Sequence, residues 1–373
     1  MADIKTHLRE IGVATTVGLL IKKIPFTIDD LYSSSKFYSL SKMVIDNDIS
    51  SASNILEFEK FTGEYKTIID NSYKLGKKIF DSQEFNFTKD DTILWLGNDT
   101  QKGDPIDLKI GNYSFSLKEE SFILKNMGLY SLLNNLTGSN FQRGLHVFST
   151  FALNEYNSWF KYTWDYLVNY INQNTTWVLN RPGKVSRITK NGNAIIFDYN
   201  GEQSIIPTSI STNAQFMNST SSTTREKVFS KWIDGVLKKD PTYLKLKKDC
   251  SETAGNQLAS KIRNEYKPDN VFTFFQIWPF DYYYAKSTST ETTILHVPSQ
   301  TNFKNIIMFV DCEYDVPSSQ LNIITTFKNT NTNKILQFRN ECRFSHGQFN
   351  GTPEAKMYIV KNTPLTELYD PIK

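Results

Sequence analysis

The sequence predicts a mixed α/β (α+β) protein, with a central mixed β-sheet flanked by helices and a small β meander inserted. Three observations support this class. Residues 1–90 show helical spacing of apolar side chains, short β-like runs occur near residue 110 and from Val271 onward, and turn pairs divide the runs between Trp177 and Ile206. With 373 residues, 39% of them hydrophobic, the chain can bury a full core.

The first elements are a helix, a strand and a hairpin. The segment Asn54–Phe80 carries an apolar stripe on one helical face, which we expect to pack on a sheet. The run Thr92–Leu96 predicts a buried strand. Two further strands, Ile106–Ile110 and Tyr113–Leu117, flank the turn pair Gly111-Asn112 and therefore predict a tight hairpin.

Beyond the hairpin, the sequence predicts alternating helical and β segments. Apolar spacing from Phe122 to Leu133 predicts a helix that ends near Gly138, and a second, aromatic helix is expected over Phe151–Ile171. The Ser-, Thr- and Asn-rich stretch Pro207–Thr224 reads as a flexible loop or linker.

The last third is expected to begin with helices over Arg225–Tyr266 and to continue as strands. The predicted strands are Val271–Trp278, Thr293–Val297, Asn305–Val310, Leu321–Phe327, Ile335–Phe344 and Lys356–Val360. We expect three parts: residues 1–176 with the N-terminal helices and hairpin, 177–224 with the inserted meander and linker, and 225–373 completing the core and a recognition surface.

The overall charge limits what kind of nucleic-acid site the chain can have, and the cysteines indicate its cellular compartment. With 42 basic and 39 acidic residues the net charge is only +3, so a nucleic-acid site must be a local cluster. The three cysteines lack the spacing of a zinc site or a disulfide framework and indicate a cytoplasmic protein. The apolar stretch Ile11–Ile21 follows charges of both signs and is too short for a membrane span, so no membrane association is expected.

The hairpin carries the residues that suggest chemistry. Asp107 lies at the start of one strand and Lys118 at the end of its partner, so an antiparallel pair can bring the two side chains together. On the second strand, Ser116 and Lys118 share a face with Ser114, while Phe115 and Leu117 point into the core. An acid and a lysine are thus expected on an anchored hairpin.

This arrangement resembles the PD-(D/E)xK nuclease superfamily, whose type II restriction endonucleases combine an acidic site, a hairpin, and an acid-x-Lys triplet. The match is Pro105-Ile106-Asp107, eight intervening residues, and Ser116-Leu117-Lys118. The resemblance covers the hairpin and the helix on each side, and it implies a restriction-endonuclease-like core. Two departures are an extra residue between Pro105 and Asp107, and serine in place of the second carboxylate.

The resemblance implies that a carboxylate from a nearby helix replaces the one missing at Ser116. We expect Glu120, ahead of Glu64 and Glu119. Asp107, the Leu117 carbonyl and this acid would hold Mg²⁺, which prefers oxygen ligands. Lys118 would orient or deprotonate the attacking water during phosphodiester hydrolysis.

A second segment, near the C-terminus, suggests DNA recognition. Between Gln337 and Gly351 polar side chains alternate with aromatic ones. Arginine can pair with guanine, and glutamine or asparagine with adenine, in the major groove. The candidate DNA-binding residues are Arg339, Arg343, His346, Gln348 and Asn350. The alternative is a strand and loop whose polar side simply faces solvent.

The resemblance therefore implies a Mg²⁺-dependent enzyme that cuts double-stranded DNA at a short specific sequence. A cognate DNA methyltransferase would act as its partner in the system, and a homodimer is compatible with such an enzyme. Two alternatives stay open. One is a non-catalytic DNA-binding or structural protein in which the hairpin and its charges are only scaffold and surface, and the other is a nuclease for modified, damaged or single-stranded DNA.

Overall fold

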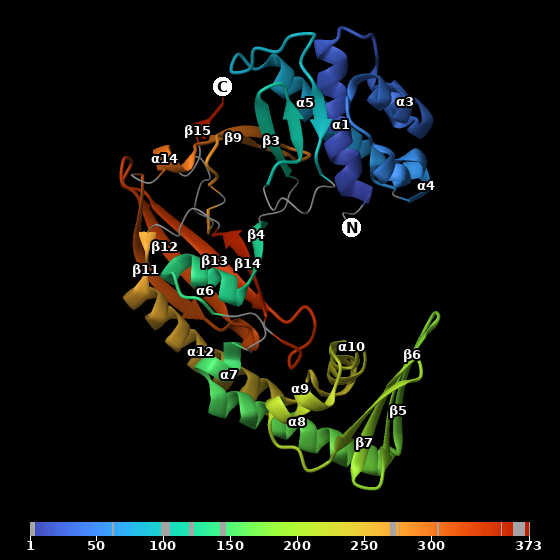
Figure 1. Ribbon diagram of the computed structural model, residues 1–373, viewed down its shortest axis with the longest axis vertical. Coiled ribbons are helices and arrows are strands. Elements are labelled where there is room, and N and C mark those ends of the chain that lie inside the picture. The colour runs from blue at the N-terminus through green and yellow to red at the C-terminus, as the bar shows by residue number, and fades with distance from the viewer. Residues whose placement is uncertain are drawn as a thin grey trace.

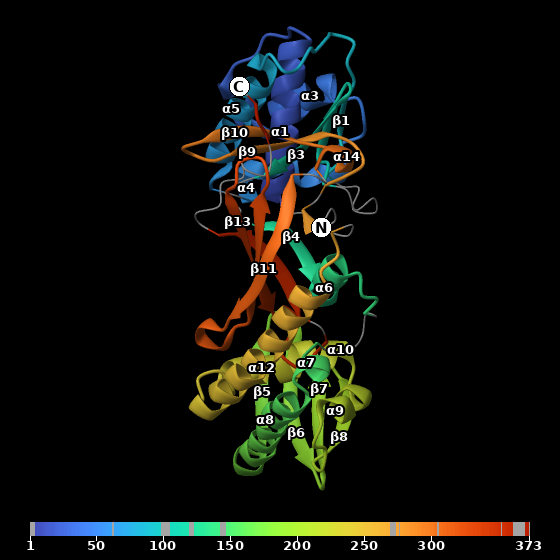
Figure 2. The same cartoon turned by 90° about the vertical axis from the view of Figure 1, so that its left-hand side faces the viewer.

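A computed structural model describes residues 4–61, 63–97, 105–118, 123–141, 147–268, 274–275, 277–303, 306–351, 353–360 and 370–372. Helices combine with three separate β-sheets, so the α+β class is confirmed. Figure 1 shows a chain curved like a letter C, with the N-terminal body at one end. The turned view in Figure 2 shows the parts stacked along the long axis.

The N-terminal body is built around one buried helix. Its helical elements are α1 (Ile4–Ile21), α2 (Ile28–Tyr32), α3 (Ser34–Val44), η1 (Ser50–Glu57), α4 (Phe58–Phe61) and α5 (Tyr65–Asp81). Nearly every residue of α1 from His7 onward is buried, and α1 packs along α5 and against β1. The single helix expected over 54–80 is divided, because the amphipathic helix α5 begins only at Tyr65.

The first sheet is mixed, as predicted. Its strands lie in the order β1 (Ile93–Trp95), β2 (Leu108–Ile110), β3 (Tyr113–Lys118), β9 (Tyr282–Ser287), β10 (Thr292–Val297) and β15 (Asp370–Pro371). Only the central pair β3–β9 is parallel. The hairpin β2–β3 is present with its turn at Gly111, whose φ of +53° favours glycine.

Most of the later strands form a second, antiparallel sheet instead of extending the first, which corrects the prediction. Its order is β11 (Ile307–Asp315), β12 (Asn322–Asn329), β13 (Ile335–Arg343), β14 (Glu354–Ile359) and β4 (Ile123–Gly128). The helix predicted from Phe122 is also wrong over its first half, because residues 123–128 pair with β14 as a strand. Pairing with a distant strand here overrides the helical spacing.

The helical elements between β4 and β12, apart from those within residues 213–237, are α6 (Leu129–Thr137), α7 (Val147–Phe151), α8 (Leu153–Asn174), α12 (Pro241–Glu265), α14 (Gln300–Phe303) and the 3-10 turn η5 (Pro317–Ser319). Helix α6 contacts β4 and β14 of the second sheet, and α7 contacts α8 and α12. Helix α12 packs on β11 and β12 and also contacts α8. Among the described helices, none is both long enough and apolar enough to cross a membrane.

The β meander predicted between Trp177 and Ile206 is present as a third sheet. Strands β5 (Thr176–Arg181), β6 (Lys184–Asn191), β7 (Ala194–Tyr199) and β8 (Glu202–Pro207) pair antiparallel in sequence order. Its inward side chains, among them Ile188 and Phe197, belong to the large core that also contains α8 and α12.

The stretch Pro207–Thr224, expected as a linker, is helical over its second part. It contains α9 (Asn213–Ser219) and α10 (Ser222–Thr224), and the π-helical turns η2 (Arg225–Phe229) and η3 (Ile233–Leu237) follow, separated by α11 (Ser230–Trp232). The side chain of Thr212 accepts a hydrogen bond from the Gln215 backbone N–H and caps α9. The polar residues that suggested a loop therefore act as helix caps.

Candidate active site

The backbone of Asp107 is fixed between two strands of the mixed sheet. Its N–H donates to the carbonyl of Phe115 (2.9 Å), and its carbonyl accepts from the N–H of Leu96 (2.9 Å). Phe115 is fully buried, so the hydrophobic side of the hairpin anchors this position. The Asp107 carboxylate is consequently held at the end of β2 beside β3.

The structure brings Asp107 and Lys118 together, as predicted. The backbone N–H of Leu117 donates to Asp107 Oδ2 at 2.7 Å, and Lys118 Nζ lies 3.5 Å from the same oxygen. The Asp107 and Lys118 side chains remain 19% and 29% exposed. Both can therefore meet a molecule that arrives from solvent.

A third ionisable group, Glu10 of α1, lies within electrostatic range of this pair. It is only 3% exposed, and its Oε2 accepts a hydrogen bond of 2.8 Å from Trp95 Nε1. Burial, and then the Asp107 carboxylate, raise the pKa of Glu10 to about 7, although Trp95, Arg9 and Lys118 act in the opposite direction. The carboxylates of Glu10 and Asp107 thus repel each other inside the body.

The position of Glu10 depends on a glycine in the segment after β1. A Cβ atom added at Gly97 would lie 2.0 Å from Glu10 Oε2 and 2.7 Å from Trp95 Nε1. No side chain fits that space, so the backbone passes directly beside the buried carboxylate. Glu10 was not found by the sequence reasoning. The signal available was a pair of charges, Arg9-Glu10, inside a strongly apolar helix.

The donor set fits Mg²⁺ better than a soft metal. Glu10 and Asp107 supply carboxylate oxygens, and Mg²⁺ typically takes one or two carboxylates together with waters and substrate phosphate. A cation would also relieve the repulsion between them. Among the described residues, three or more His, Cys, Asp or Glu side chains nowhere gather as a metal site, so this pair is the donor set that can be described.

Ser116 lies on β3 between Phe115 and Leu117, whose backbone groups bond Asp107, and it supplies no charge. It is 1% exposed, and within the described ranges its Oγ has no hydrogen-bond partner. A buried hydroxyl without a partner is unfavourable for stability. The Leu117 carbonyl remains a predicted ligand, since the contact seen at Leu117 is made by its N–H.

The three carboxylates expected to replace the one missing at Ser116 are placed differently. Glu119 and Glu120 lie outside the described residues. Glu64 precedes α5 and forms an exposed ion pair with Lys5, with Nζ and Oε2 2.6 Å apart. The carboxylate that the structure does bring to Asp107 comes from Glu10.

The candidate DNA-binding residues of β13 lie on its solvent side. Arg339 and Arg343 are exposed, while Phe338 and Cys342 face the core. The Arg339 guanidinium lies 5.0 Å from the centre of the Tyr358 ring. Arg343 forms an ion pair of 3.0 Å with Glu341 and is 45% exposed, so both guanidinium groups remain reachable.

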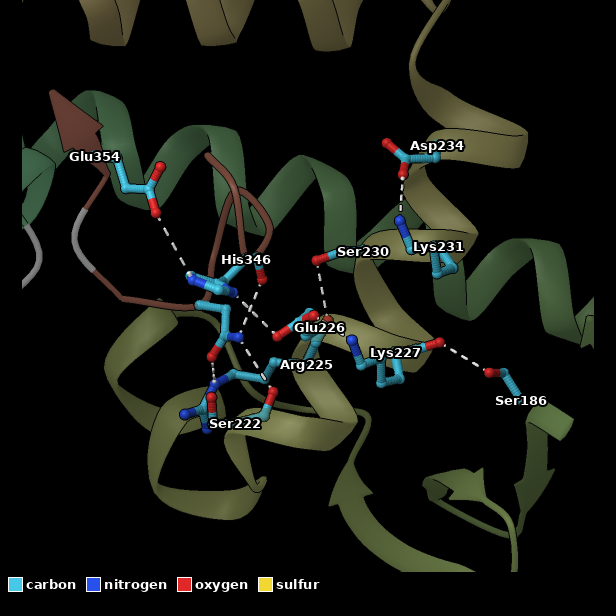
Figure 3. A network of polar contacts seen from close by, with 11 residues as sticks. Ser186, Ser222, Arg225, Glu226, Lys227, Ser230, Lys231, Asp234, His346 and Glu354 are labelled. Atoms are coloured by element: carbon cyan, nitrogen blue, oxygen red, sulfur yellow. Dashed lines mark hydrogen bonds and ion pairs between the residues drawn. The ribbon is translucent and has the colours of Figure 1, made fainter. Parts of the chain in front are cut away.

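The loop after β13 is tied to η2 and α10. Asn350 Oδ1 accepts from Arg225 Nε (2.7 Å), and its amide nitrogen donates to the carbonyls of Ser222 (3.1 Å) and His346 (3.0 Å). Phe349 is buried against Trp159, with ring centres 4.6 Å apart. Figure 3 shows this junction.

The other two candidates of this loop differ in exposure. His346 is 63% exposed and lies between Glu226 and Glu354, with Nδ1 3.2 Å from a Glu226 oxygen and Nε2 4.0 Å from a Glu354 oxygen. Gln348 Oε1 is buried, with no hydrogen-bond partner in the part of the chain that is described. Whether any of the five binds DNA stays a prediction.

Comparison with known proteins yields no relative. No protein-family model matches the chain, and neither the curated proteins nor the solved structures give a match. A function must therefore be argued from the site itself.

Proposed function

We propose that this chain is a Mg²⁺-dependent endonuclease of the PD-(D/E)xK type that cuts double-stranded DNA at a specific sequence, as type II restriction enzymes do. One observation carries the proposal. Asp107 and Lys118 meet beside a hairpin of a mixed sheet, within electrostatic range of a third charged group, the buried carboxyl of Glu10.

The helix carboxylate supplies what the sequence motif lacks. In the resemblance, serine at position 116 requires an acid from a nearby helix, and Glu10 belongs to α1, which packs on β1. A buried carboxylate with a raised pKa, next to a second carboxylate, does not stabilise the folded state when it is ionised. Strongly perturbed ionisable groups of this kind are typical of catalytic sites.

The side chains have distinct roles in this proposal. Glu10 and Asp107 would hold Mg²⁺, which when bound neutralises charge that develops on the phosphate. The Leu117 N–H fixes the orientation of Asp107. Lys118 Nζ, 3.5 Å from Asp107 Oδ2, would orient the attacking water or accept its proton, in keeping with its partial exposure.

Sequence recognition would come from elsewhere in the chain. The exposed guanidinium groups of Arg339 and Arg343 can offer paired donors to a guanine edge. A cognate DNA methyltransferase would protect the same sequence in the host, and a homodimer would match a symmetric site.

The test is cleavage of a long DNA of known sequence by the purified protein. With Mg²⁺ we expect a discrete set of fragments, and with a chelator no cutting. Parallel reactions on methylated and on single-stranded DNA distinguish restriction from the alternative nuclease substrates. Binding without any Mg²⁺-dependent cutting or nicking would contradict the proposal and support a non-catalytic DNA-binding protein.

A further inference from the structure

The hairpin formed by β5 and β6 concentrates positive charge. Residues 176–191 include four basic residues and no acidic one, although the whole chain carries only +3. The basic residues are Arg181, Lys184, Arg187 and Lys190, and all four are exposed. The remainder of the chain therefore contains more acidic than basic groups.

These cations form no ion pairs among the described residues, unlike those on the neighbouring helices, although Asp198 of β7 is the cross-strand neighbour of Arg187. On α8 and α12, Lys161, Lys245 and Lys261 each pair with an acid four residues later, at 2.6, 3.0 and 2.5 Å. Within the described residues, none of the four hairpin cations forms an ion pair. Lys190 donates to Asn172 Oδ1 at 2.7 Å, which is an uncharged partner.

The hairpin presents its cations on a fixed frame. Arg181 and Lys184 are directly opposite each other across the Pro182-Gly183 turn. Ile188 is buried in the core, and Ser186 Oγ donates to the Lys227 carbonyl at 2.8 Å. Figure 3 shows this contact, which joins β6 to η2. These contacts of β6 fix the base of the hairpin to the rest of the protein.

The arrangement in space places this charge opposite the catalytic body. In Figure 1 the hairpin β5–β6 lies at one end of the C, on its open side, with its turn directed toward the body that contains α1 and β3. Strands β13 and β14 lie between the two ends. A rigid polyanion lying on the open side would meet the hairpin at one end and the body at the other.

We propose that the β5–β6 hairpin is an arm that contacts the phosphate backbone of duplex DNA and holds it on the open side of the C. The inference rests on the proposed function, because it assumes that DNA is the substrate. Arg181, Lys184 and Arg187 would bind phosphates without regard to sequence. Contacts of this kind position a duplex and carry no base information.

The experiment compares two charge-reversal variants of the full chain. The arm variant is Arg181→Glu, Lys184→Glu and Arg187→Glu. The control variant is Lys161→Glu, Lys245→Glu and Lys248→Glu, which changes the same charge at lysines that are exposed on helices. Affinity for a duplex of random sequence is measured by fluorescence anisotropy in Ca²⁺ over a range of salt concentrations, and thermal unfolding verifies the fold.

We expect the arm variant to bind at least about tenfold more weakly than the control. Each phosphate contact contributes about 0.9 to the slope of log K against log salt, so the slope should fall by roughly 2 to 3. A milder variant, Arg181→Ala with Lys184→Ala, removes two of the three contacts and should show about two-thirds of that change in slope, and it serves if the triple reversal unfolds. Equal affinity and slope in arm and control variants would overturn the inference.

The two proposals fail in different ways. If the wild type cuts DNA with Mg²⁺ while the arm variant binds and cuts like the control, the proposed DNA contact of the arm is wrong and the proposed endonuclease activity is supported. If the wild type binds DNA through the arm but never cuts it, the proposed DNA contact of the arm is supported and the proposed hydrolysis is wrong.

Discussion

The Glu10 and Asp107 site and the Asn350 loop use buried polar groups in opposite ways. In the loop, the Asn350 amide makes three hydrogen bonds, and its partner Arg225 also donates to the Thr220 and Met217 carbonyls. In the site, two carboxylates lie close enough for one to raise the pKa of the other. The first arrangement stabilises the fold, while the second opposes it.

This difference teaches which polar residues are available for function. A side chain whose hydrogen bonds are already made within the chain must break them before it can bind a ligand. A buried carboxylate beside a second, partly exposed carboxylate gains from a cation that arrives from outside. The carboxylate pair is therefore the stronger functional candidate. Among the loop residues, those whose side chains make fewer hydrogen bonds within the chain are more available to bind a ligand.

The largest effect is expected at Asp107 and Lys118. Asp107→Ala and Lys118→Ala should each reduce Mg²⁺-dependent cleavage on the order of 10²–10⁴-fold, the range for loss of a group that acts on the reacting water. Single-turnover cleavage of a cognate duplex measures the rate. Lys109→Ala is the matched control, since Lys109 is exposed on the same hairpin. Near-normal cutting by either variant would place the catalytic centre elsewhere.

Glu10→Gln should lower cleavage and raise the Mg²⁺ concentration required, and at the same time stabilise the protein. The folded state raises the pKa of Glu10 from 4.5 to about 7, so above pH 7 it disfavours the charged form and the neutral amide is better tolerated. With a chelator at pH 8, the gain should be on the order of 1–3 kcal/mol. Toward pH 4 it should become small, because Glu10 is then mostly protonated in both states.

The matched control for Glu10→Gln is Glu64→Gln, which removes an exposed carboxylate that forms a surface ion pair with Lys5. It should leave both rate and stability within experimental error. Loss of cleavage in Glu64→Gln together with normal cleavage in Glu10→Gln would reverse the assignment in favour of Glu64, which the sequence ranked after Glu120.

Local signals were sufficient to predict the hairpin but not its partner helix. The turn pair Gly111-Asn112 and strict alternation along residues 113–118 define the geometry that joins Asp107 to Lys118. Glu10 reaches the site only through tertiary packing, and even its Trp95 partner is 85 residues away. No local pattern encodes such a contact.

The errors in the fold have the same origin. The apolar spacing from Phe122 to Leu133 is compatible with a helix, yet its first part becomes β4 because β14 offers a strand to pair with. In the stretch Pro207–Thr224, composition alone suggested a linker. The same Ser and Thr residues cap short helices once Phe216 is buried in the core.

A smaller effect is expected on recognition by β13. Arg339→Ala and Arg343→Ala should each weaken binding to the cognate sequence about ten- to a hundredfold, since a good bidentate base contact contributes ~1–3 kcal/mol. Binding to random DNA should change much less. Anisotropy in Ca²⁺ measures both affinities, and Arg187→Ala is the comparison that should weaken both equally. Equal losses on both duplexes for Arg339→Ala and Arg343→Ala would mean phosphate contacts.

The smallest effect on activity is expected at Asn350, where the loop predicts a cost in stability instead. Asn350→Ala removes an acceptor from Arg225, a largely buried cation, and should destabilise the protein by about 1–3 kcal/mol. Thermal unfolding measures the change, with Asn218→Ala on the exposed face of α9 as control. Well below the melting temperature, the variant should bind cognate and random DNA with the same affinities as the wild type. A variant that keeps its stability but loses only cognate affinity would show that Asn350 reads bases despite its internal hydrogen bonds, and the distinction between bonded and available side chains would then fail at this loop.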